Sequence, residues 1–486
     1  MGACALLCLA AATRPEGPSP GRPVRPPLHY AAPAGSAGGD GSRTRPWDLA
    51  TALSGAGGAV QAGDTVWLLG GTYRGAFRTT LEGMPGRYIV FRQAPGARAT
   101  IDGTLRADGS YLAFWGFEIL QSAAAGGGTY GLQANTNAGR FINLVIHDVG
   151  TQGVSFWTPG VDAELYGCIV YNNGSHFNLD HGVYAHNERG TKRMADNIFF
   201  NNYARGIQIY ASPRNADLRN FEVEGNVSFN NGTISGVPGR FNLLISAEVP
   251  TGGMVAVDNM LYYSPGAEGT NIRLGHYAAA NNEDIVLRNN YVAGGRLALD
   301  MTRAWREAVV ENNVFIGDGE MVRLGGAGVA HYRWTGNRYY RDPAARAWLY
   351  ERARLDFAGW RRETGVAAGD EALVASPDTK LFVRPNKYEA GRATIVVYNW
   401  GRQPTVSVDV TGVLRVGDRF ELRNVQAWFD APLVTGTYAG TPIAIPMTGV
   451  DPPARIGRAG APAPRTGPLF DVFVLTSGSP RATPGT

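Results

Sequence analysis

The strongest constraint on the fold is an internal repeat of short β-like segments. Segments of the form apolar-x-apolar-x-x-Asn-apolar align on Asn197, Asn226, Asn259, Asn290, Asn313 and Asn337. Upstream, Phe117, Val145 and Cys168 take the same position, and the nine positions lie 28, 23, 29, 29, 33, 31, 23 and 24 residues apart. A sustained period of about 20 to 50 residues indicates a solenoid or a propeller. Because the segments are short and alternating, without helical patterns between them, the repeat favours a β-solenoid.

Each period also carries a second short strand, usually after a glycine. In chain order these strands are GLQAN, GVSFW, GVYAH, GIQIY, NLLIS, NIRLG, RLALD and MVRLG. Two or three short strands per period, separated by variable loops, describe a right-handed parallel β-helix, and the aligned asparagines are expected to form an internal amide ladder at a turn. Over residues 45–340 the chain resembles pectate-lyase-like β-helix proteins. This resemblance implies the fold but no particular reaction, since the fold hosts lyases, hydrolases, epimerases and non-enzymes.

The domain organisation follows from shifts in composition along the chain. An apolar leader is followed by a Pro-rich linker, and Asp48 is expected to cap a short helix that closes the first coil. After Asn337 the repeat ends, and alternation returns later without it. We predict an all-β protein with a signal segment (1–12), a linker (13–27), a right-handed parallel β-helix (28–342), a helical cap or linker (343–369), a smaller antiparallel β-sandwich (370–478) and a disordered tail (479–486).

Charge and composition exclude several classes of partner. The 486 residues carry a formal net charge of only +4, and no basic run with interleaved aromatics indicates nucleic acid. No segment approaches the roughly 18 apolar residues of a membrane span. The three cysteines build neither a disulfide framework nor a zinc motif. The leader predicts secretion, to the outside of the cell or to the periplasm, and we expect a monomer that binds a polysaccharide or oligosaccharide.

Strand alternation assigns side chains to the two faces of the coils. The apolar residues Val183, Ala185, Ile207 and Ile209 are expected inside, and their neighbours outside. Equivalent outward residues of successive coils then form columns. One predicted column holds Gln133, Ser155, Tyr184, Gln208, Leu244, Arg273, Ala298 and Arg323. The next holds Asn135, Trp157, His186, Tyr210, Ser246, Gly275 and Asp300, while His181 and Arg205 stack just before their strands.

The outward columns are rich in residues that bind sugars. Aromatic rings suit the apolar faces of pyranose rings, whereas amides, Arg and carboxylates suit hydroxyl and carboxylate groups. The predicted substrate-binding residues are Trp157, Tyr184, Glu188, Arg189, Lys192, Gln208, Arg273 and Asp300. The predicted catalytic residues are His181, His186, Arg205, Tyr210 and Glu248.

Two chemistries fit these residues. β-Elimination of a uronic-acid polysaccharide needs a cation or amide near the carboxylate, a base for the C5 proton and an acid for the leaving oxygen, for which His186 or Tyr210 are candidates. Hydrolysis needs two carboxyl groups about 5 to 9.5 Å apart, and Glu188 and Glu248 are predicted two coils, or about 9.6 Å, apart. We favour the lyase, with a glycoside hydrolase and a non-enzymatic glycan-binding surface protein as alternatives.

No metal site or cofactor is predicted. The Asp clusters that bind calcium in several β-helix lyases are not present as a motif in this sequence. This weakens the analogy with those lyases in detail, although calcium stays open as a cofactor that the resemblance implies.

Overall fold

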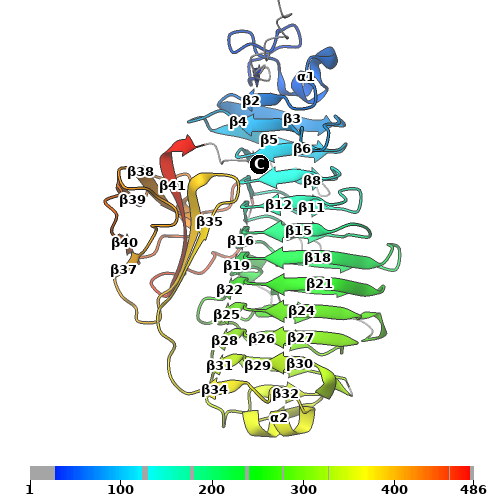
Figure 1. The fold of residues 1–486 in the computed structure, drawn as a ribbon, viewed down its shortest axis with the longest axis vertical. Coiled ribbons are helices and arrows are strands. Elements are labelled where there is room, and N and C mark those ends of the chain that lie inside the picture. Colours follow the sequence, from blue (N-terminus) through cyan, green and yellow to red (C-terminus); the bar gives the residue numbers. More distant parts are fainter. Residues whose placement is uncertain are drawn as a thin grey trace, which may run out of the picture.

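The coils of the chain stack into one long column. The computed structural model describes residues 28–122, 130–175, 180–235, 240–275, 279–326, 328–458 and 460–481. The predicted signal segment and Pro-rich linker, and the last residues of the predicted tail, lie outside the described residues. Figure 1 shows the coils between helix α1 (Leu49–Leu53) and helix α2 (Phe357–Thr364), with a smaller β domain along one side.

Each coil contributes strands to three parallel columns, which we call the flank, site and domain columns. The flank column is a 12-stranded sheet of β1 (Leu28–Ala31), β2 (Thr65–Leu68), β4 (Ile89–Gln93), β6 (Leu112–Trp115), β9 (Arg140–Ile142), β12 (Glu164–Tyr166), β15 (Lys192–Ala195), β18 (Leu218–Glu224), β21 (Thr251–Val257), β24 (Asp284–Arg288), β27 (Glu307–Glu311) and β30 (Arg333–Thr335). The site column holds β3 (Gly71–Thr79), β5 (Ala99–Ala107), β8 (Leu132–Ala134), β11 (Val154–Phe156), β14 (His181–Ala185), β17 (Arg205–Ala211), β20 (Phe241–Ala247), β23 (Thr270–Leu274), β26 (Leu297–Met301), β29 (Glu320–Leu324) and β32 (Trp348–Tyr350). The domain column holds β7 (Glu118–Leu120), β10 (Val145–His147), β13 (Ile169–Tyr171), β16 (Ile198–Phe200), β19 (Val227–Phe229), β22 (Met260–Tyr262), β25 (Tyr291–Ala293), β28 (Val314–Ile316), β31 (Arg338–Tyr340) and β34 (Glu371–Leu373).

The inside of the column is apolar, as the alternation predicted. Val183, Ala185, Ile207 and Ile209 are fully buried or nearly so. At the first coil the side chain of Asp48 accepts a hydrogen bond of 2.8 Å from the backbone N–H of Thr51, so the predicted helix cap is confirmed.

The aligned asparagines form a continuous buried ladder, which confirms that prediction. The side-chain oxygen of Asn226 accepts both the backbone N–H (3.0 Å) and the side-chain amide (2.9 Å) of Asn197. Asn226 in turn donates to Asn259, and its amide also reaches the carbonyl of Met194 at 2.8 Å. The same contacts recur through Asn290 and Asn313 to Asn337, which donates to the carboxylate of Asp370. The side-chain amides of the ladder are therefore paired from Asn197 to Asp370.

The turn before each ladder residue explains why Asn and Asp recur there. Asp196, Asp258, Asn289 and Asn312 directly precede ladder residues and have φ between 54° and 57°. This left-handed conformation is costly for most residues but tolerated by Asn and Asp, whose short side chains hydrogen-bond locally. Before Asn226 and Asn337 the same conformation is taken by Gly225 (φ 64°) and Gly336 (φ 71°), so each of these corners is marked in the sequence by Asn, Asp or Gly.

Replacing one ladder residue is expected to cost stability. Asn226→Ala removes the acceptor of two hydrogen bonds and leaves a buried N–H and a buried carbonyl unpaired, each worth about 1 to 3 kcal/mol. We expect the free energy of unfolding in urea to fall by about 3 kcal/mol. Asn137→Ala is the control, since this asparagine is exposed and its side chain accepts one bond, from the N–H of Val161. Equal losses in both variants would contradict a stabilising ladder.

The structure differs from the predicted domain bounds in three places. Strand β34 pairs in parallel with β31, and Asp370 ends the asparagine ladder, so the solenoid includes residues that the sequence assigned to the sandwich. The predicted helical cap contains only the eight residues of α2, preceded by β32 and the antiparallel strand β33 (Ala353–Leu355). Strand β41 (Phe470–Arg481) extends into the predicted tail.

The C-terminal domain is an antiparallel sandwich. Its five-stranded sheet has the order β35 (Lys380–Pro385), β36 (Ala390–Tyr398), β41, β38 (Arg419–Asn424) and β39 (Val434–Thr437), and its two-stranded sheet pairs β37 (Thr405–Val408) with β40 (Ile443–Pro446). One face of the larger sheet packs on the smaller sheet through Ile395, Val397 and Leu475. The other face packs on the domain column, where the ring of Phe470 stacks on Tyr262 at 4.3 Å.

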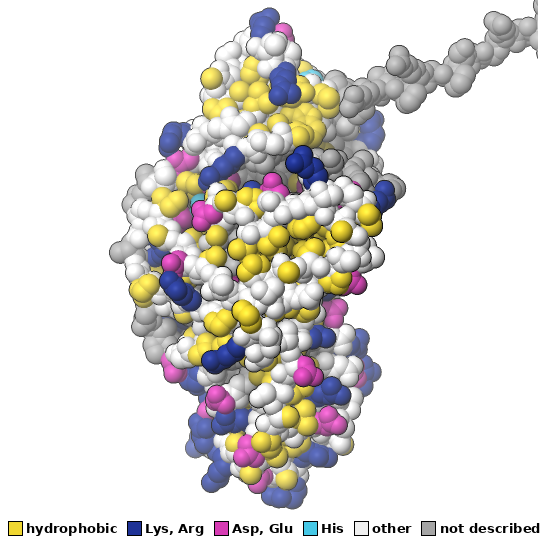
Figure 2. All heavy atoms as spheres, turned by 90° about the vertical axis from the view of Figure 1, so that its left-hand side faces the viewer, with side chains coloured by type: hydrophobic (Ala, Val, Ile, Leu, Met, Phe, Trp, Pro, Cys, Tyr) yellow, Lys and Arg dark blue, Asp and Glu magenta, His cyan; other side chains and the backbone are white. Residues whose placement is uncertain are grey.

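The sandwich therefore lies on a different column from the predicted site residues. Seen from its side, much of the surface is apolar or uncharged around the middle, whereas basic and acidic side chains alternate towards the end that carries α2 (Figure 2). Because one large apolar cluster joins both domains, the sandwich is part of the same folded body as the coils.

Candidate functional site

Register brings the predicted outward residues of the site column together. Tyr184 pairs with Gln208, Gln208 with Leu244, and Leu244 with Arg273. The next partner of Arg273 is Asp300, not the predicted Ala298, and Asp300 in turn pairs with Arg323. The predicted column is thus correct up to Arg273 and wrong by two residues in the following coil.

Aromatic rings from three neighbouring coils form one wall. The ring of Tyr184 lies 4.8 Å from that of Trp157 and 6.2 Å from that of Tyr210. The imidazole of His181 approaches Tyr184 edge-on at 5.6 Å. Trp157, Tyr184 and Tyr210 are partly exposed, so their faces are available to a ligand. We call these three residues the aromatic wall.

The acidic partner of the wall comes from the next coil. The hydroxyl of Tyr210 donates a hydrogen bond to Oε1 of Glu248, which directly follows β20. Neither side chain is fully buried. A phenol bonded to a carboxylate is able to pass its proton to that carboxylate, so this pair is the best-placed proton-transfer unit among the predicted catalytic residues.

His181 is buried and contacts Arg205. It is 0% exposed, and its Nε2 lies 3.5 Å from Nη1 of Arg205. Burial, with the neighbouring Arg205 and Arg240, holds the pKa of His181 well below its ordinary value. The neutral imidazole therefore accepts from the guanidinium, which also donates to the side-chain oxygen of Gln208.

Two guanidinium groups share one aromatic ring. Arg205 and Arg273 each lie 5.5 Å from the ring centre of Phe241, which stands between them in the stack of coils. Arg273 is also 3.7 Å from Asp300, whose side chain is only 3% exposed compared with 21% for Arg273. The cations thus reach the surface, while the acid lies beneath them.

Two predicted site residues, His186 and Lys192, are buried where exposure was expected. His186 is 3% exposed, so the prediction that it faces water is wrong; the backbone of Ala216, in the loop after β17, lies beside its ring. Burial is the main cause of the lowered pKa of His186. Lys192 is 0% exposed and points into the coil, which rules out the predicted substrate contact in this conformation. Glu188 and Arg189 are exposed in the loop between β14 and β15.

A second titratable cluster, which the sequence did not reveal, lies where the sandwich meets the domain column. The imidazole of His147 is held between Glu118 Oε1 and Asp148 Oδ2, each at 2.8 Å. Arg98 makes two bonds to Glu118, and the N–H of Ile456 from the sandwich donates to Asp148 at 2.8 Å. The two acidic partners outweigh burial and raise the pKa of His147, while its hydrogen bonds help to lower that of Glu118 to about 2.

This cluster predicts a pH-dependent stability. Because the pKa of His147 is raised in the folded protein, its contribution to the free energy of unfolding is complete below the ordinary histidine pKa. That contribution is lost as the pH rises through the pKa that His147 has in the folded state. Above that value a neutral imidazole donates to only one carboxylate and faces the other with a lone pair. The contribution of Glu118 is lost instead as the pH falls from its ordinary range to about 2.

We therefore expect His147→Phe to destabilise the protein most at mildly acidic pH, and less as the pH rises. The difference in unfolding free energy between wild type and variant, measured across pH, checks this. His331→Asn is the control, because this histidine is exposed and bonds only to backbone carbonyls. A difference that stays constant or grows with pH would refute a charged His147.

The described residues do not build a metal centre. No group of three or more His, Cys, Asp or Glu side chains in the described ranges lies close enough together to hold a metal ion. No step below uses calcium, which the sequence left open. No helix in the described part of the chain is long and apolar enough to cross a membrane.

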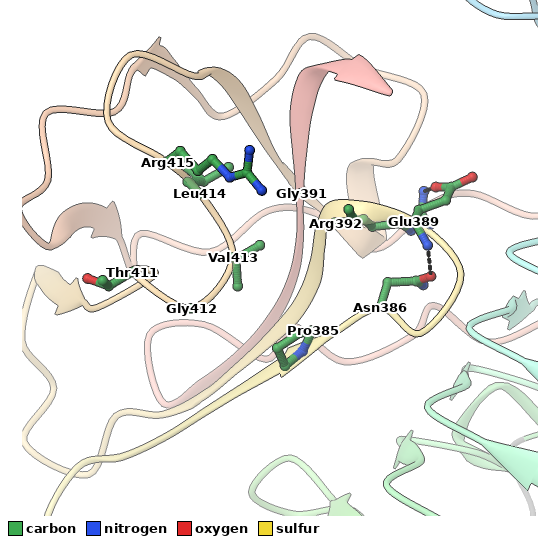
Figure 3. Close-up of a pocket in the computed structure, with 11 residues that line it drawn as sticks. Pro385, Asn386, Glu389, Gly391, Arg392, Thr411, Gly412, Val413, Leu414 and Arg415 are labelled. Atoms are coloured by element: carbon green, nitrogen blue, oxygen red, sulfur yellow. Dashed lines mark hydrogen bonds and ion pairs between the residues drawn. The ribbon is translucent and has the colours of Figure 1, made fainter. Parts of the chain in front are cut away.

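A pocket of about 260 Å³ lies in the sandwich, not at the aromatic wall. Residues 385–386, 389–392 and 411–415 line it, and Figure 3 shows Arg392 and Arg415 at its two sides. Glu389 is 3.6 Å from Arg392. No predicted site residue lines this pocket, so it is separate from the candidate site.

Comparison with known proteins agrees with the fold. Residues 105–245 match the family described as right handed beta helix region. A search of curated proteins found no match. Three similar solved structures are the pectate lyase Pel9A (17% identity, 64% of this chain and 79% of that chain, TM-score 0.44), a rhamnogalacturonan lyase (17%, 64% and 87%, TM-score 0.47) and the GH136 lacto-N-biosidase from Eubacterium ramulus (15%, 72% and 68%, TM-score 0.45). The chain is a right-handed parallel β-helix protein with a C-terminal β-sandwich.

Proposed function

We propose that the chain is a polysaccharide lyase that cleaves a uronic-acid glycan by β-elimination on the outer face of the site column. The observation that carries this proposal is the hydrogen bond from Tyr210, a member of the aromatic wall, to Glu248. Arg205 and Arg273 lie on strands of the same column, on either side of Phe241. The apolar leader further leads us to propose that the protein is secreted.

The guanidinium groups would hold the uronate. A bidentate guanidinium neutralises a carboxylate and stabilises the negative charge that develops when the proton on C5 is removed. Arg205 is well suited, because His181 and Gln208 fix its orientation from two sides. Arg273 lies across the ring of Phe241 and would bind a neighbouring sugar.

Tyr210 and Glu248 would move the proton. As the C5–H bond breaks, its proton goes to the oxygen of Tyr210, whose own proton passes to Glu248. The electron pair of the C5–H bond forms the C4=C5 double bond, and the C4–O bond breaks. Tyr210 then gives a proton to the leaving oxygen and recovers one from Glu248, so the net transfer is from C5 to that oxygen.

The wall would orient the sugar rings. Trp157 and Tyr184 are held by packing against each other, and they offer partly exposed ring faces next to Tyr210. Stacking on these faces would place C5 near the phenol before the reaction, which is how bound geometry lowers the barrier of a transfer.

The test is incubation with a panel of uronic-acid polysaccharides, with and without neutral glycans as comparison. An ultraviolet absorbance from the double bond conjugated with the carboxylate, together with new reducing ends, is the expected result. Reducing ends without this absorbance would mean hydrolysis. Binding without either product would mean a glycan-binding protein, and both results would overturn the proposal.

A further inference from the structure

We propose that Lys192 is a positioning residue, whose internal ammonium group clamps the corner where the coils of Trp157 and His186 leave the site column. The inference rests on the proposed function in one respect, which is the role given to the aromatic wall. It concerns a buried cation that the proposed reaction does not use.

Lys192 breaks the apolar pattern of its own column. In the following coils its register partners are Phe221, Met254, Ile285 and Ala308. All four are apolar and buried, as is usual inside the stack. A charged side chain is costly at such a position unless its hydrogen bonds are satisfied. The burial of a lysine at this one coil therefore requires hydrogen-bond partners that offset its cost.

Three backbone carbonyl groups provide these partners for Lys192. The Nζ of Lys192 lies 2.5 Å from the carbonyl oxygen of Trp157, 3.1 Å from that of His186 and 3.3 Å from that of Phe156. It also lies 4.4 Å from the centre of the Phe156 ring. The three carbonyls belong to two successive coils, since Phe156 ends β11 and His186 follows β14. One side chain thus joins two coils at the corner next to the wall.

Three acceptors match the three donors of an ammonium group, whereas a neutral amine donates only two hydrogen bonds. Burial lowers the pKa of Lys192 to well below its ordinary value. Hydrogen bonds to three carbonyl oxygens favour the charged form on general grounds. The chain has three lysines and 42 arginines, so the lysine here is an unusual choice. A compact ammonium fits a converging set of three carbonyls better than a planar guanidinium fork does.

Loss of the ammonium group would allow the backbone at Trp157, and with it the aromatic wall, to shift. The carbonyl of Trp157 would keep only its bond of 3.1 Å from the N–H of Gly160, and the buried carbonyl of His186 would lose the ammonium. The corner would then shift to bring these carbonyls to water or another donor. Because the ring of Trp157 packs on Tyr184 at 4.8 Å, such a shift would disturb the surface that we assign to the sugar.

The first experiment uses Lys192→Met, which keeps the length of the side chain and removes its donors. On the polysaccharide identified by the lyase assay we expect KM to rise about tenfold and kcat to change by less than about threefold, because ground-state positioning is lost while Tyr210 and Glu248 remain. The circular-dichroism signal of the Trp157–Tyr184 pair, defined as the difference between wild type and Trp157→Phe, should be lost as well.

Met194→Ala is the matched control. Met194 lies two residues further along β15, is fully buried in the same core, and has no side-chain polar group. It should lose comparable stability but keep both KM and the Trp157–Tyr184 signal. Unchanged KM and signal in Lys192→Met, or equal changes in the control, would overturn the positioning role.

A measurement on the unaltered protein covers the case in which Lys192→Met does not fold. With Nζ labelled by ¹⁵N, only three lysines contribute, and Lys380 and Lys387 are not fully buried. We expect one ammonium signal whose hydrogens exchange slowly with water. Rapid exchange at all three lysines, or a neutral amine at the buried one, would refute the clamp. The signal and the circular dichroism need no substrate, so they test the clamp even if the proposed lyase activity fails.

Discussion

Tyr210→Phe is expected to lower kcat on the uronic-acid substrate by about 10² to 10⁴-fold, the usual contribution of a group that transfers a proton. The ring remains, so packing against Tyr184 and stacking on sugar should persist and KM should change little. The substitution removes only the hydroxyl that donates to Glu248. Initial rates of double-bond formation, measured over a range of substrate concentrations, separate these two effects.

Tyr340→Phe is the control for this variant. Tyr340 ends β31 in the domain column and is not part of the aromatic wall, so its loss of a hydroxyl should leave kcat unchanged. If Tyr210→Phe retains more than about a tenth of wild-type kcat, then Tyr210 does not carry the proton. The reacting face would then have to be sought elsewhere on the coils.

The second large effect is expected from removing the sandwich, residues 375–486. This truncation leaves β34 and Asp370 in place, so the parallel sheet and the asparagine ladder stay complete. It uncovers a stripe of buried rings on the domain column, namely Tyr171, Phe200, Phe229, Tyr262 and Tyr291. Each such side chain contributes about 1.5 to 3 kcal/mol when buried. We expect aggregation or a fall of the unfolding midpoint by about 10 °C or more.

Thermal unfolding followed by circular dichroism, with light scattering for aggregation, measures this effect. Ile445→Ala is the partial comparison, because Ile445 packs between the two sheets of the sandwich and does not touch the coils. That variant should loosen the sandwich without exposing the stripe. A truncated chain that stays soluble with an unchanged midpoint would show that the sandwich is an independent module.

The sequence predicted the coils well because each position of their repeat is occupied by a residue type that is favoured there for one main structural reason. An asparagine inside a coil is favoured only where its amide pairs with the next one, so the ladder from Asn197 to Asn337 was visible as a pattern. A second buried ladder was missed although its signal was present. It runs from Asn173 through Asn202 and Asn231 to Asn242 and Asn271, and three of its members are the second residue of an Asn-Asn pair.

The site was harder to predict because strand alternation holds only within a strand. His186 lies one residue beyond β14, where the chain turns the corner, and the loop after β17 comes back beside it. Lys192 begins β15, and a charged residue at an inward position has no sequence signature. Asp300 takes the place predicted for Ala298, two residues earlier, because the register of β26 differs from the predicted one. Tyr210 and Glu248, by contrast, come together in adjoining coils as their spacing suggested.

The carboxylate of Asp370 gives the asparagine ladder a direction and an end. Each side-chain oxygen accepts from the asparagine of the coil before, and each side-chain amide donates to the ladder residue of the coil after and to a backbone carbonyl of the coil before. The ionised carboxylate of Asp370 accepts from Asn337 and has no hydrogen to donate further. A whole coil with its own asparagine, inserted between two members, would find an acceptor on one side and a donor on the other. Growth of such a protein by duplication of coils is therefore open at every internal position, and is closed beyond Asp370.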